Sequence, residues 1–499
     1  MQPKAGRKRC LLLANATRGE RMVEDRNVFQ QFGWVIYKYF LTLISMLRTN
    51  IRDFGMFIAL IVIFVIFQFM TNGIFLGAFN FTNLLNQSAY VAVLAVGMTL
   101  VIVTQQIDLS VGYIGAFLGA YVVVAVETGG QPVILALLGA LVITIIVGII
   151  KGYFVAKIKV PSFVVTLAGM FIFKGLLFFK TNNRTISTTN DFFIKVGIGY
   201  LPTYDVSGYD LFSLISGAVI IIAAITSGIL TRKKHAKLGI PSEKVELFIT
   251  KIFLLSVVIG YLTYTFASNK GISYLLLITV VVVVIYHFMS TQTTLGRRIY
   301  AVGGNPEAAE LSGISVEKTI IIVFVSMGIT AMIAGIMYVS RLENASPKHG
   351  PFWELYAIAA VFIGGTSAKG GIGKVVNAVV GAVVIISLKN GMSLAGIDAN
   401  IEPIILGSVL LFAVVFDIYT RNVMPVDLVG MHYARKENKA ELLLARDNFF
   451  KAKRELQEAE KENRQDLIEY EYKFTNAQGV FNKIKDKIRV SVEADFIKE

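Results

Sequence analysis

Long apolar runs, each long enough to cross a membrane as a helix, recur through the first 420 residues of the chain. A bilayer core of roughly 30 Å needs about 20 helical residues, and the run at 247–267 reaches that length. The composition agrees, because 55% of the residues are hydrophobic and 16% are charged, whereas a soluble chain carries about a quarter charged residues. The sequence therefore predicts an all-α, polytopic transmembrane helix bundle.

The apolar runs predict about 10–12 spans. Two of the runs, near residues 112 and 352, are short and bordered by glycine, so we expect broken or re-entrant helices that protein or water must cover. The expected spans are 54–70, 84–104, 112–127, 132–150, 161–179, 211–230, 247–267, 272–290, 319–340, 352–366, 375–391 and 401–419.

Lysine and arginine are distributed unequally between the loops that join these spans. If the N-terminus is inside, most of the lysine and arginine residues before Arg421 fall in inner segments, while the outer loops hold six of them. Basic residues are retained on the cytoplasmic side of short loops. The pattern predicts cytoplasmic N- and C-termini and a cytoplasmic loop at 291–318. We attribute the basic residues to topology and lipid contact rather than to a ligand, so the net charge of +14 predicts no nucleic-acid partner.

Three regions follow from these patterns. Residues 1–53 form a basic cytoplasmic N-terminal segment in which 32–47 favours an interfacial helix. Residues 54–420 form the transmembrane domain. Residues 421–499 form a charged cytoplasmic tail without Pro or Gly from 431 to 478, which predicts one long, solvated amphipathic helix rather than a stable coiled coil.

The polar loop at 291–318 carries the signals of a short helix. Asn305 can cap the helix, Pro306 suits its first position, Glu307 suits its positive end, and Gly313 permits a stop. The loop lacks a nucleophile and base pair, and the chain lacks the GxxxxGK[ST] phosphate loop, so we expect no ATP hydrolysis by this chemistry. The loop is predicted to be a docking element.

Two glycine-bearing stretches, 105–115 and 362–373, each connect one apolar segment to another through a small-residue turn. A Gly-Ala pair follows each of them, which favours two weakly related halves, as in transporter folds. Gly115 and Gly119 form a small-xxx-small face, whose ordinary meaning is close helix packing.

Asp108 lies between two spans in surroundings otherwise free of charge, and it has two interpretations. A carboxylate within a span is costly and usually functional, for example as an ion or substrate site. Alternatively, Asp108 or Ser110 caps the next helix by accepting bonds from free backbone N–H groups. We favour the structural role.

The chain shows no catalytic constellation and no metal site. It has one cysteine, Cys10, and none of its four histidines has a partner at metal-ligand spacing. We therefore expect no cofactor on this chain and no enzymatic activity. Two alternatives are an ion-coupled secondary transporter, for which Asp108 is the candidate residue, and an integral membrane enzyme, which would need a polar cluster at a membrane face.

Three ordered stretches resemble the permease subunits of bacterial ABC importers for monosaccharides, in the wider branched-chain amino acid permease superfamily. They are VGMTLVIVTQQIDLSVGYIGAFLGA, LGRRIYAVGGNPEAAELSGI and IAAVFIGGTSAKGGIGKVVNAVVGAVVIISLKNGMSLAGI. The resemblance covers roughly residues 50–422. The basic insertion at 231–246 is similar to xylose and multiple-sugar permeases rather than to ribose or galactose permeases.

The resemblance implies a membrane-spanning subunit in the bacterial cell membrane that carries a monosaccharide and works with other proteins. Its implied partners are an ABC ATPase subunit that binds ATP, an extracytoplasmic sugar-binding protein, and a second permease copy in a homodimer. A nucleoside or amino acid cargo stays an alternative. The ATPase-coupling positions it implies are Glu307, Ala308, Ala309 and Gly313, although the Leu-Pro found downstream in the general motif is missing. The candidate translocation path comprises Asp108, Ser110, Gly112, Gly364, Gly365 and Gly371.

Overall fold

The computed structural model describes residues 51–238, 245–420, 439–461, 469–480 and 482–483. It divides into two units, one of residues 52–421 and one formed by the two ends of the chain, and each is described here by itself. The predicted N-terminal segment, including the interfacial helix at 32–47, lies outside the described residues.

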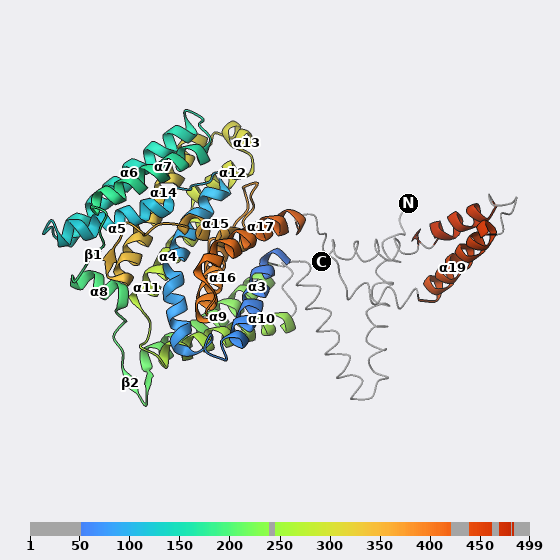
Figure 1. Cartoon of the computed structure of the whole chain (residues 1–499). Helices are drawn as coiled ribbons and strands as arrows, with labels where there is room; N and C mark the ends of the chain where they lie inside the picture. Colours follow the sequence, from blue (N-terminus) through green and yellow to red (C-terminus); the bar gives the residue numbers. More distant parts are fainter. Residues whose placement is uncertain (1–50, 239–244, 421–438, 462–468, 481, 484–499) are drawn as a thin grey trace. The chain divides into compact units, whose positions relative to one another are not determined.

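All twelve predicted spans are helical in the structure, so the prediction of an all-α bundle is confirmed (Figure 1). Four two-residue strands add two short antiparallel pairs, β1 (Ile186–Ser187) with β4 (Asn344–Ala345) and β2 (Asp205–Val206) with β3 (Tyr209–Asp210). The helices of this unit are α3 (Ile51–Met70), α4 (Ala78–Val103), α5 (Val111–Glu127), α6 (Val133–Ala156), α7 (Ser162–Lys180), α8 (Asp191–Ile198), α9 (Leu211–Lys237), α10 (Val245–Ala267), α11 (Tyr274–Gln292), α12 (Thr294–Gly304), α13 (Pro306–Leu311), α14 (Val316–Leu342), α15 (Trp353–Ile363), α16 (Val375–Leu394), η1 (Ala399–Ile401) and α17 (Glu402–Thr420).

Seven helices of the described chain are long and apolar enough to cross a membrane, namely α4, α6, α7, α9, α11, α14 and α16. Five further apolar stretches are shorter, namely Gly55–Met70 in α3, Val111–Glu127 in α5, Lys251–Ala267 in α10, Trp353–Ile363 in α15 and Ala399–Val415 in η1 and α17. Together with the seven long helices, they occupy the positions of the twelve predicted spans. Helices α5 and α15 are the short ones that the glycine borders predict, with 17 and 11 residues.

Helix α14 lies at the centre of the bundle because small residues let its neighbours approach its backbone. A Cβ added at Gly335 would lie 1.9 Å from the carbonyl oxygen of Gly115, and one at Gly119 would lie 2.7 Å from the carbonyl oxygen of Gly335. On another face of α14, a Cβ at Gly152 of α6 would lie 2.6 Å from the Cα of Ile321. The predicted packing face of Gly115 and Gly119 is thus confirmed, and α14 is its partner.

Helix α5 begins part-way along α14 rather than at its end. Gly115 faces the carbonyl oxygen of Ala331 and Gly119 faces that of Gly335, so the two helices run parallel. Val111, the first residue of α5, is therefore displaced by about 16 Å along α14 from Val316, at 1.5 Å per residue. Most of α5 is buried, which satisfies the requirement that protein covers a broken span.

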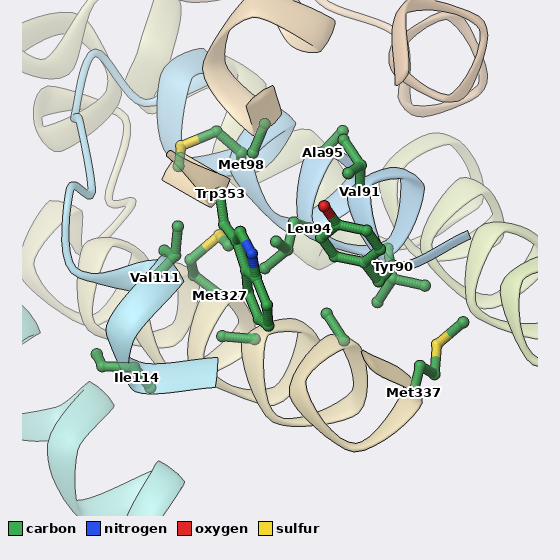
Figure 2. Close-up of a cluster of buried hydrophobic side chains, with 14 of the residues drawn as sticks. Tyr90, Val91, Leu94, Ala95, Met98, Val111, Ile114, Met327, Met337 and Trp353 are labelled. Atoms are coloured by element: carbon green, nitrogen blue, oxygen red, sulfur yellow. The ribbon is translucent and has the colours of Figure 1, made fainter. Parts of the chain in front are cut away.

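The largest core cluster joins α4, α5, α14 and α15. Figure 2 shows Trp353, the first residue of α15, in this cluster with Met98 of α4, Val111 of α5 and Met327 of α14. All four side chains are buried. Trp353 thereby fixes the start of α15 against the start of α5.

Helices α9 and α10 pack mainly on each other and expose apolar side chains over most of their length. Helix α10 contacts α4, and Tyr261 donates a hydrogen bond to the carbonyl oxygen of Leu76 at 2.7 Å. Figure 1 shows the β2–β3 hairpin, which precedes α9, at the end of the bundle opposite α13.

The described tail contains α19 (Lys439–Lys461) and a second helical stretch at 469–480. The rings of Phe449 and Phe474 stack with centroids 5.4 Å apart. In one continuous helix they would be about 37 Å apart, at 1.5 Å per residue. The prediction of a single long helix is therefore wrong, because the two described stretches pack against each other; Ala445 and Ala452 of α19 are buried.

Candidate functional site

The segment 291–318 folds as two helices, of which only the second was expected. Helix α12 follows Thr293, whose side chain caps it by accepting from the N–H of Gly296 at 3.2 Å. Helix α13 starts as predicted, since Asn305 Oδ1 accepts from the N–H of Ala308 at 3.0 Å and Pro306 occupies the first position. Gly313 follows the helix with a φ of 81°, in the left-handed region that glycine tolerates.

Helix α13 presents one face to solvent and the other to the bundle. Glu307, Ala308 and Gly313 are exposed, whereas Ala309 is buried at 4% exposure. Of the four predicted coupling residues, Ala309 therefore packs inward and cannot touch a docked partner on this face. Leu311 was missed by the sequence analysis and is 91% exposed. Its side chain is therefore accessible to a partner that docks on this face.

The two glycine-bearing stretches meet next to α12. The N–H of Gly371 donates to the carbonyl oxygen of Val103 at 2.9 Å, which joins the loop after α15 to the end of α4. The side chain of Gln105 donates to the carbonyl oxygen of Gly303 at 2.8 Å. A Cβ at Gly303 would lie 1.8 Å from the Val103 oxygen. Helix α12 therefore contacts both stretches directly.

Asp108 is fully buried and forms an ion pair that the sequence analysis did not predict. Its Oδ2 lies 2.5 Å from Lys151 Nζ of α6, and its Oδ1 accepts from the N–H and Oγ of Ser110 at 3.0 and 2.5 Å. Lys151 Nζ also donates to Ser110 Oγ at 3.1 Å and lies 5.6 Å from the centre of the Phe324 ring on α14. The side chains of Asp108, Ser110 and Lys151 therefore serve as hydrogen-bond partners for one another.

This ion pair changes two predictions. Lys151 was attributed to a cytoplasmic loop, but it lies within α6 and is 4% exposed, so topology and lipid contact do not explain it. Asp108 was also the candidate for ion coupling, and the Lys151 ammonium occupies the position that a coupling cation would need. Asp108 accepts from the N–H of Ser110, the N-cap residue of α5, but neither side chain accepts from an N–H of α5 itself, so the predicted helix cap is not formed. A path role for Asp108 and Ser110 stays a prediction.

The glycines predicted to line a path each have a packing or backbone function. A Cβ at Gly112 would lie 2.4 Å from the carbonyl oxygen of Gly350, and one at Gly364 would lie 2.8 Å from the backbone of α16. Gly365 and Gly371 have φ values of 80° and 71°. Packing and backbone conformation are sufficient to explain why these four positions are glycine. That the four glycines line a translocation path stays a prediction.

A cavity of about 210 Å³ lies at the other end of α14, and the sequence analysis missed it. Tyr90, Tyr338 and Trp353 form one side, and the ion pair of Lys389 and Glu402 forms another. The available signal was a lysine, Lys389, within one apolar run and a glutamate, Glu402, at the start of the next.

Comparison with known proteins now defines the class. The chain belongs to the family described as branched-chain amino acid transport system / permease component, whose pattern matches residues 80–414. It is therefore a multi-pass membrane permease of the ABC importer type, a transport component rather than an enzyme.

Individual relatives match across most of their length. The xylose transport system permease protein of Haemophilus influenzae is 38% identical over 368 residues, which cover 74% of this chain and 96% of the relative. The xylose transport system permease protein of Escherichia coli is 39% identical over 74% of this chain and 93% of the relative. The ribose import permease protein of Haemophilus influenzae is 33% identical over 73% of this chain and 92% of the relative. No solved structure matches the chain.

Proposed function

We propose that this chain forms the translocation path of an ATP-driven importer for a monosaccharide, with xylose as the first cargo to test. The observation that carries the proposal is the 38% identity to a xylose permease over 96% of that protein. The family match over residues 80–414 includes the segment 291–318 and both glycine-bearing stretches. Ribose, and an amino acid as in the family description, are the competing cargoes.

The proposed ATPase partner docks on the exposed face of α13. Glu307 and Ala308 are exposed there, and Leu311 adds an apolar contact. Docking at this position would move α12 against Val103 and Gly371, and α14 follows α13 after a short connection. This end of the bundle and both termini are cytoplasmic in the proposal, in agreement with the unequal distribution of lysine and arginine.

The other proposed partners are an extracytoplasmic sugar-binding protein at the opposite end and a second copy of the chain. The chain itself would bind no cofactor, and ATP would bind to the partner ATPase, because the sequence contains no phosphate-binding loop. The buried pair of Asp108 and Lys151 supports ATP coupling over ion coupling, since its charges are already compensated.

The test is uptake by proteoliposomes that contain this chain with a candidate ATPase and a candidate sugar-binding protein. We expect labelled D-xylose to accumulate inside the vesicles only when their lumen contains ATP. Ionophores that collapse proton and sodium gradients should not prevent this accumulation. Uptake abolished by the ionophores would establish the secondary-transporter alternative. Labelled D-ribose and L-leucine, measured in parallel, decide the cargo.

A further inference from the structure

The cavity at the far end of α14 is lined by five helices, α4, α14, α15, α16 and α17, together with η1 and one loop. Tyr90 comes from α4, Tyr338 from α14, Trp353 from α15 and Lys389 from α16, while the loop at 343–352 closes one side. Tyr338 lies 22 residues beyond Val316, which is about 33 Å along α14 at 1.5 Å per residue. The cavity is therefore remote from α13 and belongs to the opposite end of the proposed path.

One wall of the cavity is aromatic. The ring centroids of Tyr338 and Trp353 are 4.5 Å apart, and Tyr90 lies 4.9 Å from Tyr338 and 5.1 Å from Trp353. His349 adds an imidazole ring 4.9 Å from Tyr338. Such faces bind the C–H face of a sugar ring, which is apolar even though the edge of the ring carries hydroxyl groups.

The facing wall is polar, and its two charged groups, Lys389 and Glu402, compensate each other; Lys348 in the adjoining loop adds one exposed positive charge to the lining. Lys389 Nζ lies 3.0 Å from Glu402 Oε1 and donates to Tyr356 Oη at 3.1 Å, and Tyr356 Oη donates to Glu402 Oε1. The side chains of Lys389 and Glu402 are 43% and 22% exposed, so a ligand in the cavity can reach both. The wall offers strong donors and a strong acceptor side by side.

This combination selects for ligand chemistry. A cation would meet the Lys389 ammonium and an anion would meet the Glu402 carboxylate. A purely apolar ligand would cover the ion pair without replacing its hydrogen bonds to water, which is costly. Burial lowers the pKa of His349 in the adjoining loop to about 4, so the imidazole adds no charge at neutral pH. The volume of about 210 Å³ is below the roughly 300–1,000 Å³ of pockets for drug-sized ligands, which favours a single sugar ring.

We propose that this cavity is a low-affinity site for one neutral monosaccharide, held between the aromatic wall of Tyr90, Tyr338 and Trp353 and the polar wall of Tyr356, Lys389 and Glu402. The proposal rests on the proposed function and names the residues that would contact its cargo. Low affinity follows from the ring contacts, because Tyr90, Tyr338 and Trp353 already pack edge to face or at a tilt against one another, and a sugar must replace part of that packing.

The chain provides its own reporter for this site. It contains two tryptophans, Trp34 and Trp353, so the full-length Trp34→Phe variant in lipid vesicles reports emission from Trp353 alone. Titration with D-xylose is expected to give a saturable change in this emission in the millimolar range. Titration with L-leucine over the same range is expected to give none.

Matched variants then test the polar wall in the same background. Tyr356→Phe keeps the ring and removes the hydroxyl, and we expect the D-xylose midpoint to rise by about 3- to 10-fold. Tyr264→Phe, at an exposed position on α10, is the control and should leave the midpoint unchanged. An unchanged midpoint in Tyr356→Phe, or an equal response to L-leucine, would overturn the proposal.

A charge exchange separates sugar contact from a purely structural ion pair. The double variant Lys389→Glu with Glu402→Lys should regain the melting temperature lost by Lys389→Met, because a pair is present again, but it should keep a weakened D-xylose response. Full recovery of both properties would mean that the pair only joins α16 to α17. Failure of the proposed function is a different result, namely no ATP-dependent sugar uptake by the wild-type assembly.

Discussion

The buried ion pair between Asp108 and Lys151 gives the sharpest prediction about the stability of the bundle. Asp108→Asn removes the charge but keeps an oxygen that can accept from the N–H of Ser110, so the variant isolates the ionic contribution. The Lys151 ammonium is then left buried and unpaired. Removing one partner of a buried pair costs about 3–5 kcal/mol.

The double variant Asp108→Asn with Lys151→Met is expected to recover most of that loss. Replacement of both partners by uncharged side chains of similar size is often close to neutral. Lys157→Met, at the exposed end of α6, is the control and should change the free energy of unfolding by less than about 0.5 kcal/mol.

Thermal unfolding of the full chain in lipid vesicles measures the effect. A change of 1 kcal/mol shifts the melting temperature of a chain of this size by about 2 °C, so Asp108→Asn should lose roughly 6–10 °C. The double variant should lie within a few degrees of the wild type. The single variant Lys151→Met completes the comparison. If the losses of melting temperature in Asp108→Asn and Lys151→Met simply add in the double variant, the two residues are not coupled, and the assignment of the pair is refuted.

Three further predictions concern the packing of α14, the surface of α13 and the loop before α15. Gly335→Leu should abolish stable folding or lower the melting temperature strongly, because even a Cβ would lie 1.9 Å from a carbonyl oxygen of α5; normal expression and melting would contradict the central position of α14. Glu307→Lys and Leu311→Asp should uncouple ATP hydrolysis from uptake without changing the amount of protein in the membrane, and normal uptake by both would exclude this docking face. His349→Gln should reduce the loss of stability between about pH 6.5 and pH 4, measured as the melting temperature across that range. The folded pKa of His349 is about 4, so the unfolded chain takes up the proton first as the pH falls and folding is weakened in that window; an unchanged pH profile would show that His349 is accessible to protons in the folded chain.

Local signals explain what the sequence predicted well. The spans follow from the length of uninterrupted apolar runs, and the cap of α13 follows from Asn305 and Pro306, which lie next to the residues they organise. The close packing of Gly115 and Gly119 was also readable, because spacing on one helix decides it. Only the identity of the partner helix needed the structure.

The features that the sequence did not predict depend on residues far apart in the chain. Asp108 and Lys151 are 43 residues apart, and only the parallel course of α5 and α14 with α6 beside them brings the charges together. Lys389 and Glu402 likewise meet across two helices. The orientation of Ala309 toward the bundle and of Leu311 away from it depends on what α13 packs against, which the pattern of six residues does not contain.

Glycine was the least informative residue type for the candidate path. Gly112 and Gly364 allow close approach, and Gly365 and Gly371 allow a positive φ. A pore lining, a tight packing contact and a turn all require a small residue, so the sequence cannot distinguish among these uses.

The uninterrupted course of α14 has a geometric consequence for the whole transporter. Its 27 residues contain no proline. Four residues separate the end of α13 from the start of α14, which carries Tyr338 near its other end. Over the roughly 33 Å between Val316 and Tyr338, a tilt of only about 5° about the near end would displace the tyrosine ring by about 3 Å. That displacement is similar to the diameter of a pyranose ring, so a small angular change at one surface would alter the cavity at the other.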